Sequence, residues 1–426
     1  MSRLFLERNG SPVRDVPRLL VYSHDTFGLG NIRRMLAICD HLCGAIPDVS
    51  ILIVSGSPML HSFRSAEGID YIKLPCLRRT EEGELGVRFL SMGLAEVARL
   101  RRELILSTVQ SFRPDVLAVD KMPNGLAGEL EPALAYLRRD LPETRTLLVL
   151  RDILDSSKKT TATWKERNYY ALVQDSFDRV AVLGQPHVFD VRTEYHFPEA
   201  LRLRTWFCGY IAKEGPVRPR AEVYRELQLS DGDKLALVTT GGGEDGYGLL
   251  QNYLQGLPPA GQSRFSSLII TGPDLAPARA RAISALAQSR PGVRVIEFTA
   301  DMLSYINAAD VVVSMAGYNT ICEILSLRKQ AVVVPRVHPV EEQRIRAERM
   351  SKLALFPMIL PRDLNPRSLM DAVTRQLDAP NPLVEERRSI DLGGLPRITR
   401  LVIELMEDSR TARPAKSLAA SAQLQW

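Results

Sequence analysis

The segment Asp310-Val-Val-Val-Ser-Met-Ala-Gly-Tyr-Asn-Thr-Ile-Cys-Glu-Ile-Leu325 decides the fold of this chain. Its three valines predict a buried strand, and Gly317 lies in a turn that leads into a helix opened by Asn319-Thr320. The free N–H groups and the dipole at a helix start attract anions, and a turn of small residues lets a phosphate approach closely. Glu323, one turn inside the helix, suits a neutral group such as a ribose hydroxyl. The pattern therefore indicates a site for a nucleoside diphosphate.

Strand–glycine–helix turns occur in many α/β proteins, so this interpretation depends on its context. Short runs rich in Val, Ile and Leu alternate with helical patterns along the chain, which is typical of βαβ units around buried parallel sheets. These runs are Leu19–Tyr22, Ile51–Val54, Val116–Val119, Leu147–Leu150, Val180–Leu183, Leu235–Val238, Leu268–Ile270, Val293–Ile296, Val311–Val313, Ala331–Val334 and the weaker Met358–Leu360. The predicted fold class is α/β, with two doubly wound Rossmann-like domains that face a cleft.

The length of 426 residues is too great for one ordinary hydrophobic core, so two domains are expected. Gly215, Pro216 and Pro219 interrupt the strand and helix rhythm, which predicts a linker. The expected organisation is a disordered arm over 1–17, a first domain over 18–213, a linker over 214–220, a second domain over 221–408 and a disordered tail over 409–426.

The composition is that of a soluble globular protein, with 45% hydrophobic and 25% charged residues. The net charge of +5 comes without a Lys/Arg block in the folded region, so no nucleic-acid partner is expected. Five cysteines without a Cys-x-x-Cys spacing indicate neither a disulfide framework nor a zinc site. No segment reaches the ~20 apolar residues that span a bilayer. A cytoplasmic location is expected, with peripheral contact at the inner membrane face left open.

A glycine-containing loop follows the first strand of each half. The first is Ser23-His-Asp-Thr-Phe-Gly-Leu-Gly-Asn-Ile-Arg-Arg34, in which Arg33 replaces the third glycine of a dinucleotide fingerprint. The second is Val238-Thr-Thr-Gly-Gly-Gly-Glu-Asp-Gly-Tyr247, whose consecutive glycines form a backbone nest able to wrap a pyrophosphate. No Gly-Lys-Ser/Thr follows, which excludes P-loop chemistry. The Asp231-Gly-Asp233 sequence is interpreted as a turn rather than a metal site.

Taken together, these motifs resemble the nucleotide-sugar-binding domain of MurG-like glycosyltransferases of the GT-B fold. The resemblance extends well over Leu235–Leu369 and more weakly over the first domain. It implies that the Gly-rich loop and the helix start hold the donor pyrophosphate, that the Phe298–Met302 turn contacts the base, that Glu323 accepts the ribose hydroxyls, and that the following loop contacts the sugar. The donor-binding residues implied are Thr240, Gly241, Gly242, Gly243, Phe298, Met302, Ala316, Gly317, Tyr318, Asn319, Thr320, Glu323, His338 and Gln343.

In the first domain, Gly28 and Gly30 match the family's Gly-x-Gly-His loop. Asn31 stands where many relatives have histidine, and an amide cannot act as a base. His24 and Asp25 are the nearest titratable groups, so the catalytic candidates are His24, Asp25 and Asn31. A structural role for His24 and a simple N-cap role for Asn31 remain open.

The resemblance implies a metal-independent glycosyltransferase without a cofactor. Its donor would be a nucleotide diphosphate sugar, expected to be a UDP-sugar, and its acceptor a hydroxyl of a glycan, a lipid-linked sugar or a small molecule. Two alternatives stay open. A UDP-sugar 2-epimerase would need acidic groups near the sugar, which Glu341-Glu342 could supply. A non-catalytic nucleotide-sugar-binding protein would have kept the donor site and lost its base.

Overall fold

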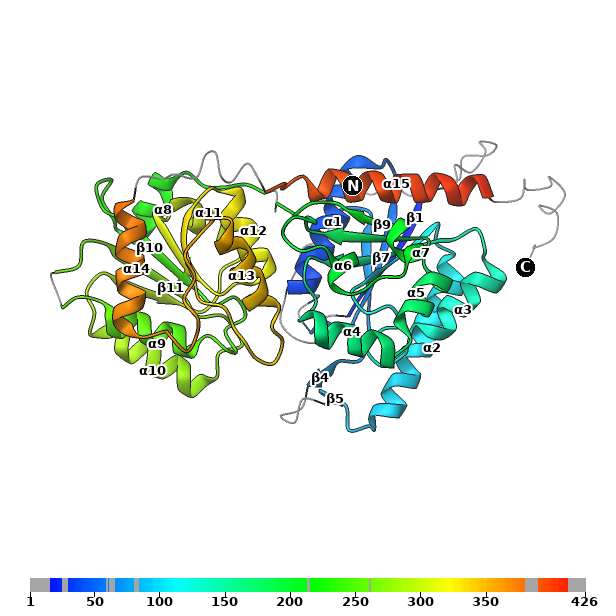
Figure 1. Ribbon diagram of the computed structural model, residues 1–426, viewed down its shortest axis with the longest axis horizontal. Coiled ribbons are helices and arrows are strands. Elements are labelled where there is room, and N and C mark those ends of the chain that lie inside the picture. Colours follow the sequence, from blue (N-terminus) through cyan, green and yellow to red (C-terminus); the bar gives the residue numbers. More distant parts are fainter. Residues whose placement is uncertain are drawn as a thin grey trace, which may run out of the picture.

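The structure, a computed structural model, consists of two α/β domains side by side (Figure 1). It describes residues 16–24, 30–58, 60, 66–79, 84–212, 215–259, 262–379 and 390–412. Two of the predicted site residues, Asp25 and Gly28, lie outside the described residues. The same is true of residues 1–15 of the expected arm and of the tail beyond residue 412.

The first domain is built on a seven-stranded parallel sheet in the order β3-β2-β1-β6-β7-β8-β9. All five strands predicted in this half are present, and the two that were not predicted, β3 and β9, form the edges. The strands are β1 (Arg18–Ser23), β2 (Ser50–Ser55), β3 (Ile69–Lys73), β6 (Val116–Asp120), β7 (Arg145–Arg151), β8 (Arg179–Leu183) and β9 (Thr205–Phe207). A separate hairpin pairs β4 (Leu77–Arg79) with β5 (Leu85–Val87). The helices are α1 (Gly30–Ala45), α2 (Leu94–Phe112), α3 (Glu131–Asp140), α4 (Ser157–Glu166), α5 (Tyr169–Ser176), α6 (Val191–Glu194) and α7 (Glu199–Leu203).

The second domain has a five-stranded parallel sheet in the order β12-β11-β10-β13-β14. Its strands are β10 (Leu235–Thr239), β11 (Ser266–Ile270), β12 (Val293–Ile296), β13 (Val311–Ser314) and β14 (Gln330–Val333). The weak run at Met358 forms only an isolated bridge to Val333. The helices are α8 (Arg220–Leu227), α9 (Tyr247–Gly256), α10 (Pro277–Gln288), α11 (Met302–Ala308), α12 (Tyr318–Ser326), α13 (Glu342–Lys352) and α14 (Pro366–Asp378).

The last described helix, α15 (Gly394–Ala412), returns to the first domain and packs on α1, β6 and β7 (Figure 1). One face of α15 is apolar and buried, through residues such as Ile398, Val402 and Leu405. We expected residues up to 408 to belong to the second domain and the tail to begin at 409. Instead the helix covers the first domain through residue 412, because its apolar stripe packs against that domain.

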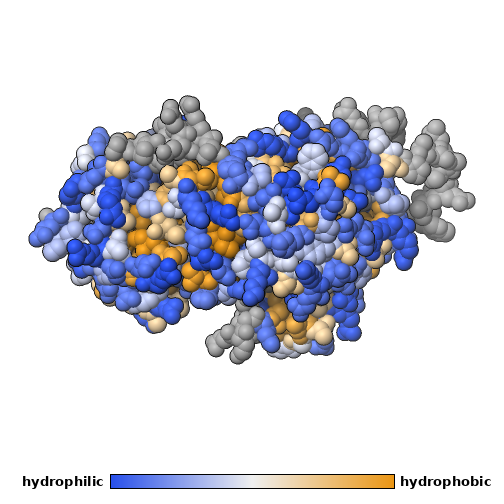
Figure 2. All heavy atoms as spheres, viewed as in Figure 1, coloured by the Kyte–Doolittle hydropathy of each residue, from blue (hydrophilic) through white to orange (hydrophobic). Residues whose placement is uncertain are grey.

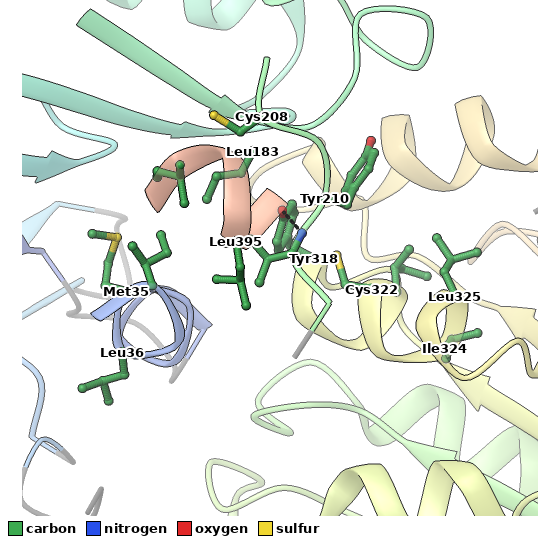
Figure 3. Packing of buried hydrophobic residues seen from close by; sticks show 14 of the residues in the cluster. Met35, Leu36, Leu183, Cys208, Tyr210, Tyr318, Cys322, Ile324, Leu325 and Leu395 are labelled. Atoms are coloured by element: carbon green, nitrogen blue, oxygen red, sulfur yellow. Dashed lines mark hydrogen bonds between the residues drawn. The ribbon is translucent and has the colours of Figure 1, made fainter. Parts of the chain in front are cut away.

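A shared core joins the two domains. Two segments of the chain cross between the domains, one after β9 and one before α15. Tyr210 of the first crossing segment stacks on Tyr318 of α12, with ring centroids 5.9 Å apart, and Leu395 of α15 lies beside them (Figure 3). The two crossing segments pair with each other, since Tyr210 N donates to Asp391 O over 2.8 Å. A Cβ on Gly394 would lie 2.6 Å from Tyr210 O, so only glycine allows this approach. The relative position of the domains therefore rests on buried contacts.

The sheet orders place a switch point between β1 and β6 and another between β10 and β13. Loops leave the carboxyl ends of such strand pairs in opposite directions, which opens a crevice for ligands. Three of the four segments that follow these strands were predicted to be functional, namely those beginning at His24, Thr240 and Met315.

The face drawn in Figure 2 is mostly hydrophilic, and hydrophobic side chains gather where the domains meet and on the lower rim of the first domain. Among the exposed apolar residues, Phe89, Leu90 and Met92 follow β5. Within the described ranges, no helix combines the length and the apolar character needed to cross a bilayer.

Candidate active site between the two domains

The start of α12 has the properties of an anion site. Gly317 is its N-cap and supplies no side-chain hydrogen bond, so the first N–H groups are not satisfied by a cap. The first turn contains no acidic residue. A Cβ built on Gly317 would meet no atom within 4 Å, which shows open space in front of the helix. A phosphate oxygen can therefore reach these N–H groups.

The Gly-rich loop after β10 is held in a conformation that only glycine adopts easily. Gly241 and Gly243 have φ angles of 70° and 100°. A Cβ on Gly243 would lie 2.4 Å from Thr271 O, so the loop packs directly on the backbone that follows β11. Gly241 is exposed and faces open space. Thr240 is buried, and its hydroxyl donates to Thr271 O over 2.7 Å, which fixes the loop from beneath.

Glu323 lies one turn inside α12 and is 2% exposed. Its Oε1 accepts a hydrogen bond from Arg33 Nη2 of α1 over 3.0 Å. Asn319 Nδ2, on the first turn of α12, donates to Gly30 O over 3.0 Å. The starts of α1 and α12, from opposite domains, therefore meet at the predicted donor site.

Two predicted donor residues of this turn point into the protein. The Tyr318 hydroxyl accepts from Ile211 N over 3.3 Å, and its ring packs between Tyr210 and the Arg34 and Arg346 guanidinium groups. Ala316 is fully buried, and its carbonyl accepts from Arg346 over 2.7 Å. In this structure both residues support the turn from inside, whereas Gly317, Asn319 and the half-buried Thr320 lie on its outer part.

The remaining predicted donor residues lie on separate loops of the second domain. Phe298 follows β12 and is 54% exposed, which leaves its ring free to stack on a base. Met302 begins α11, where the Asp301 side chain accepts from Ser304 N. Gln343 Oε1 accepts from Arg336 N over 3.2 Å, and His338 is exposed.

His24 follows β1 and is buried at the carboxyl edge of the first sheet. Its Nδ1 lies 3.1 Å from Asp120 O, which can only accept, so the proton sits on Nδ1 and Nε2 is an acceptor. Asn31 Nδ2 approaches Nε2 at 3.4 Å, and Asn31 Oδ1 accepts from Arg34 over 3.1 Å. Burial lowers the pKa of His24 to about 4, despite the nearby Asp120 carboxylate. The imidazole is therefore neutral at pH 7.

A buried charge network, which the sequence analysis missed, bridges the domains next to this histidine. Arg346 of α13 is fully buried and forms a two-pronged ion pair with Asp152, at 2.6 and 2.8 Å. It also donates to Glu342 over 2.9 Å. Arg336 reaches Glu342 at 3.0 Å, and Arg151 at the end of β7 lies 3.7 Å from it. Asp152 directly follows a buried strand, as His24 does, and that position was the available signal.

Several groups in this network have shifted pKa values. Burial would raise the pKa of Glu342, but Arg151, Arg346 and Arg336 more than offset this and lower it to about 2. Lys121 follows β6, and burial together with the neighbouring Arg151 lowers its pKa to about 7. Its backbone φ of 62° is left-handed, which places this lysine in a tight turn. Burial also lowers the pKa of Arg151.

The described residues contain no group of three or more His, Cys, Asp or Glu side chains placed to hold a metal ion. Asp233 Oδ2 accepts from Ser230 N over 2.8 Å, so it closes a turn. That turn precedes β10 and lies at the opposite end of this strand from the Gly-rich loop. The Asp231-Gly-Asp233 sequence is therefore remote from the start of α12.

Comparison with known proteins places these features in a family context. Residues 237–392 match the glycosyltransferase family 28 C-terminal domain. An uncharacterised glycosyltransferase of Methanopyrus kandleri is 26% identical over 54% of this chain and 62% of its own length. The UDP-N-acetylglucosamine–N-acetylmuramyl-(pentapeptide) pyrophosphoryl-undecaprenol N-acetylglucosamine transferase of Clostridioides difficile is 24% identical over 49% of this chain and 51% of its own length. The matched part of the chain thus spans between about half and three fifths of these relatives.

Two solved structures show how far the fold extends. MurG of Acinetobacter baumannii superposes with a TM-score of 0.57 and 14% identity, over 91% of this chain and 99% of that one. An enzyme of Listeria monocytogenes described as a UDP-N-acetylglucosamine 2-epimerase gives a TM-score of 0.61 and 13% identity, over 95% and 99%. The fold alone therefore does not separate transfer from epimerisation. The chain has the two-domain GT-B fold throughout and is MurG-like in its second domain, as the sequence resemblance predicted.

Proposed function

We propose that this protein transfers a sugar from a nucleoside diphosphate donor, a UDP-sugar, to a hydroxyl of an acceptor. The observation that supports this most is the meeting of the starts of α12 and α1 beside the buried Glu323, at the switch point of the second sheet. The family 28 match over residues 237–392 favours a nucleotide-sugar donor. UDP is the donor nucleotide named for the Clostridioides difficile relative.

In the proposed complex, the donor diphosphate lies between the start of α12 and the Gly241 to Gly243 loop. Helix dipole and backbone N–H groups there offset its negative charge, and we propose that no divalent metal is needed. Glu323 accepts the ribose hydroxyls, Phe298 and Met302 contact the base, and His338 and Gln343 contact the sugar. The acceptor oxygen forms a bond to the anomeric carbon as the bond from that carbon to the diphosphate oxygen breaks.

We assign the removal of the acceptor proton to His24. Because Asp120 O fixes the proton on Nδ1, Nε2 is the ring nitrogen that carries a lone pair, at the carboxyl edge of the first sheet. Asn31, which lies against Nε2, would orient the acceptor hydroxyl or give way to it. Asp25, which lies outside the described residues, is the second candidate for the base.

The acceptor is proposed to bind mainly on the first domain, whose loops face the donor site. A glycan, a lipid-linked sugar or a small molecule fits this role. A lipid-linked acceptor would bring the protein to the cytoplasmic face of a membrane as a peripheral partner. The name of the Clostridioides difficile relative includes a pyrophosphoryl-undecaprenol acceptor.

The structure weakens the epimerase alternative. Such an enzyme needs a carboxyl group that can exchange protons with the donor sugar. Glu342 is buried among arginines that hold its pKa near 2, and Glu341 is paired with Arg344 at 2.5 Å. Neither carboxylate is placed as a proton donor at neutral pH. A non-catalytic nucleotide-sugar-binding protein would bind UDP with the affinity that the titration described below measures, but it would not release UDP from the donor.

Replacing Glu323 with glutamine tests the ribose assignment. The amide keeps the size of the side chain but loses the charge-assisted hydrogen bonds, so UDP affinity should fall by about 1.5–3 kcal/mol. Isothermal titration measures this, and Glu404→Gln on the exposed face of α15 is the matched control. Equal UDP affinity in a folded Glu323→Gln protein would remove Glu323 from the donor site.

A further inference from the structure

Arg33 of α1 forms an ion pair with the Glu323 carboxylate, which in the proposed function accepts the hydroxyls of the donor ribose. Its Nη2 lies 3.0 Å from Glu323 Oε1, although the two residues are 290 positions apart and belong to different domains. The Arg33 side chain is 31% exposed and that of Glu323 is 2% exposed. Glu323 is fixed in buried α12, so the partner with room to move is Arg33.

The position of Arg33 on α1 is electrostatically unfavourable without an anion. The first turn of α1 contains Arg33 and no acidic residue, and Arg34 follows directly. The start of a helix is the positive end of its dipole, where cations are disfavoured. Arg34 is compensated within its own domain by Asp120, at 2.7 Å. Among the described residues, the anion that pairs with Arg33 is Glu323 of the opposite domain.

The arrival of a donor changes this balance. Once the ribose hydroxyls donate hydrogen bonds to the Glu323 carboxylate, the Arg33 guanidinium needs another anion. The diphosphate would lie at the adjacent start of α12. The distance is short, because Asn319 on that start already contacts Gly30 O, three residues before Arg33. A guanidinium suits a phosphate well, since its N–H groups match two oxygens at once.

Resting on the proposed function, we propose that Arg33 is a donor-positioning residue that nucleotide binding transfers from Glu323 to the donor diphosphate. It links ribose recognition on α12 to phosphate recognition from α1. A nucleoside without phosphates must displace Arg33 and leaves its charge without a new partner. A nucleoside diphosphate displaces it and supplies the partner. Arg33 therefore sharpens the preference for the diphosphate over the nucleoside.

The experiment compares UDP and uridine affinities of the full-length protein by calorimetry, with uridine measured in competition against UDP. In Arg33→Ala, UDP affinity should fall about tenfold or more, the loss expected for one charge-assisted hydrogen bond. Uridine affinity should stay equal or rise, because its competitor for Glu323 is gone. Arg33→Lys keeps a point charge and should retain most of the UDP preference. Arg99→Ala, on the exposed face of α2, is the control and should match wild type.

A structural role for Arg33 would lower both affinities by the same factor, and that result would overturn the proposal, as would unchanged values for both ligands. Thermal unfolding of each variant confirms that the compared proteins are folded, and Arg33→Gln replaces Arg33→Ala if the alanine variant is not. Failure of the wild-type protein to bind either ligand would instead refute the proposed function itself.

Discussion

Replacing Arg346 with methionine is expected to lower the free energy of unfolding by about 3–5 kcal/mol, the usual loss when one partner of a buried ion pair is removed. Methionine fills much of the same space, so the loss reports charge rather than volume. Asp152 would remain buried beside the Ile153 N–H and the Tyr210 hydroxyl, which both donate to it, and Glu342 would lose one of its arginines. Since Asp152 and Arg346 belong to different domains, the contact between the domains should weaken.

Urea unfolding followed by tryptophan fluorescence measures this effect, because Trp164 and Trp206 both lie in the first domain, with Asp152. Arg344→Met is the matched control. It lies on the same helix and pairs with Glu341 and Glu348 near the surface, so its removal should cost at most about 1 kcal/mol. If Arg346→Met and Arg344→Met proved equally stable, the network would not hold the domains together.

Replacing His24 with alanine is expected to lower turnover by about 10²–10⁴-fold with little change in UDP affinity, the usual effect of removing a general base. Protonated imidazole cannot accept a proton, so turnover should also fall as the pH drops through the pKa of His24. Burial lowers that pKa to about 4, which predicts an acid limb of kcat/KM near pH 4 rather than near the ordinary value of ~6.5.

Release of UDP from the donor in the presence of an acceptor measures this turnover. His41→Ala is the matched control, since His41 lies on α1 and its Nδ1 is 2.8 Å from the Thr399 hydroxyl of α15, away from the donor site. Asn31→His should be tolerated, because the resemblance to the MurG-like family implies a histidine at this position. A full rate in His24→Ala would place the base elsewhere, with Asp25 as the next residue to test.

The sequence predicted the buried strands well, because a strand covered on both faces must be a continuous apolar run. The two strands it missed lie at the sheet edges. β3 has only half-buried and exposed residues, and β9 has only three residues. The helix α15 carries an apolar stripe, but nothing local in that stripe specifies which domain it covers.

The loops of the site could be predicted because the carboxyl ends of parallel strands converge at the switch points. The direction in which each side chain points could not be predicted from the sequence. Tyr318 and Thr240 belong to the predicted motifs, yet tertiary packing turns their side chains inward. The pairs Arg33–Glu323 and Arg346–Asp152 join residues 290 and 194 positions apart, a separation at which sequence patterns specify no contact.

We propose above all that this chain binds a nucleoside diphosphate at the start of α12 without a metal ion. Isothermal titration of UDP into the wild-type protein in the presence of EDTA tests it most directly. We expect one site per chain, tighter binding of UDP than of uridine, and no change on removal of EDTA. No binding of UDP, GDP or TDP, or binding that EDTA abolishes and manganese restores, would contradict this proposal.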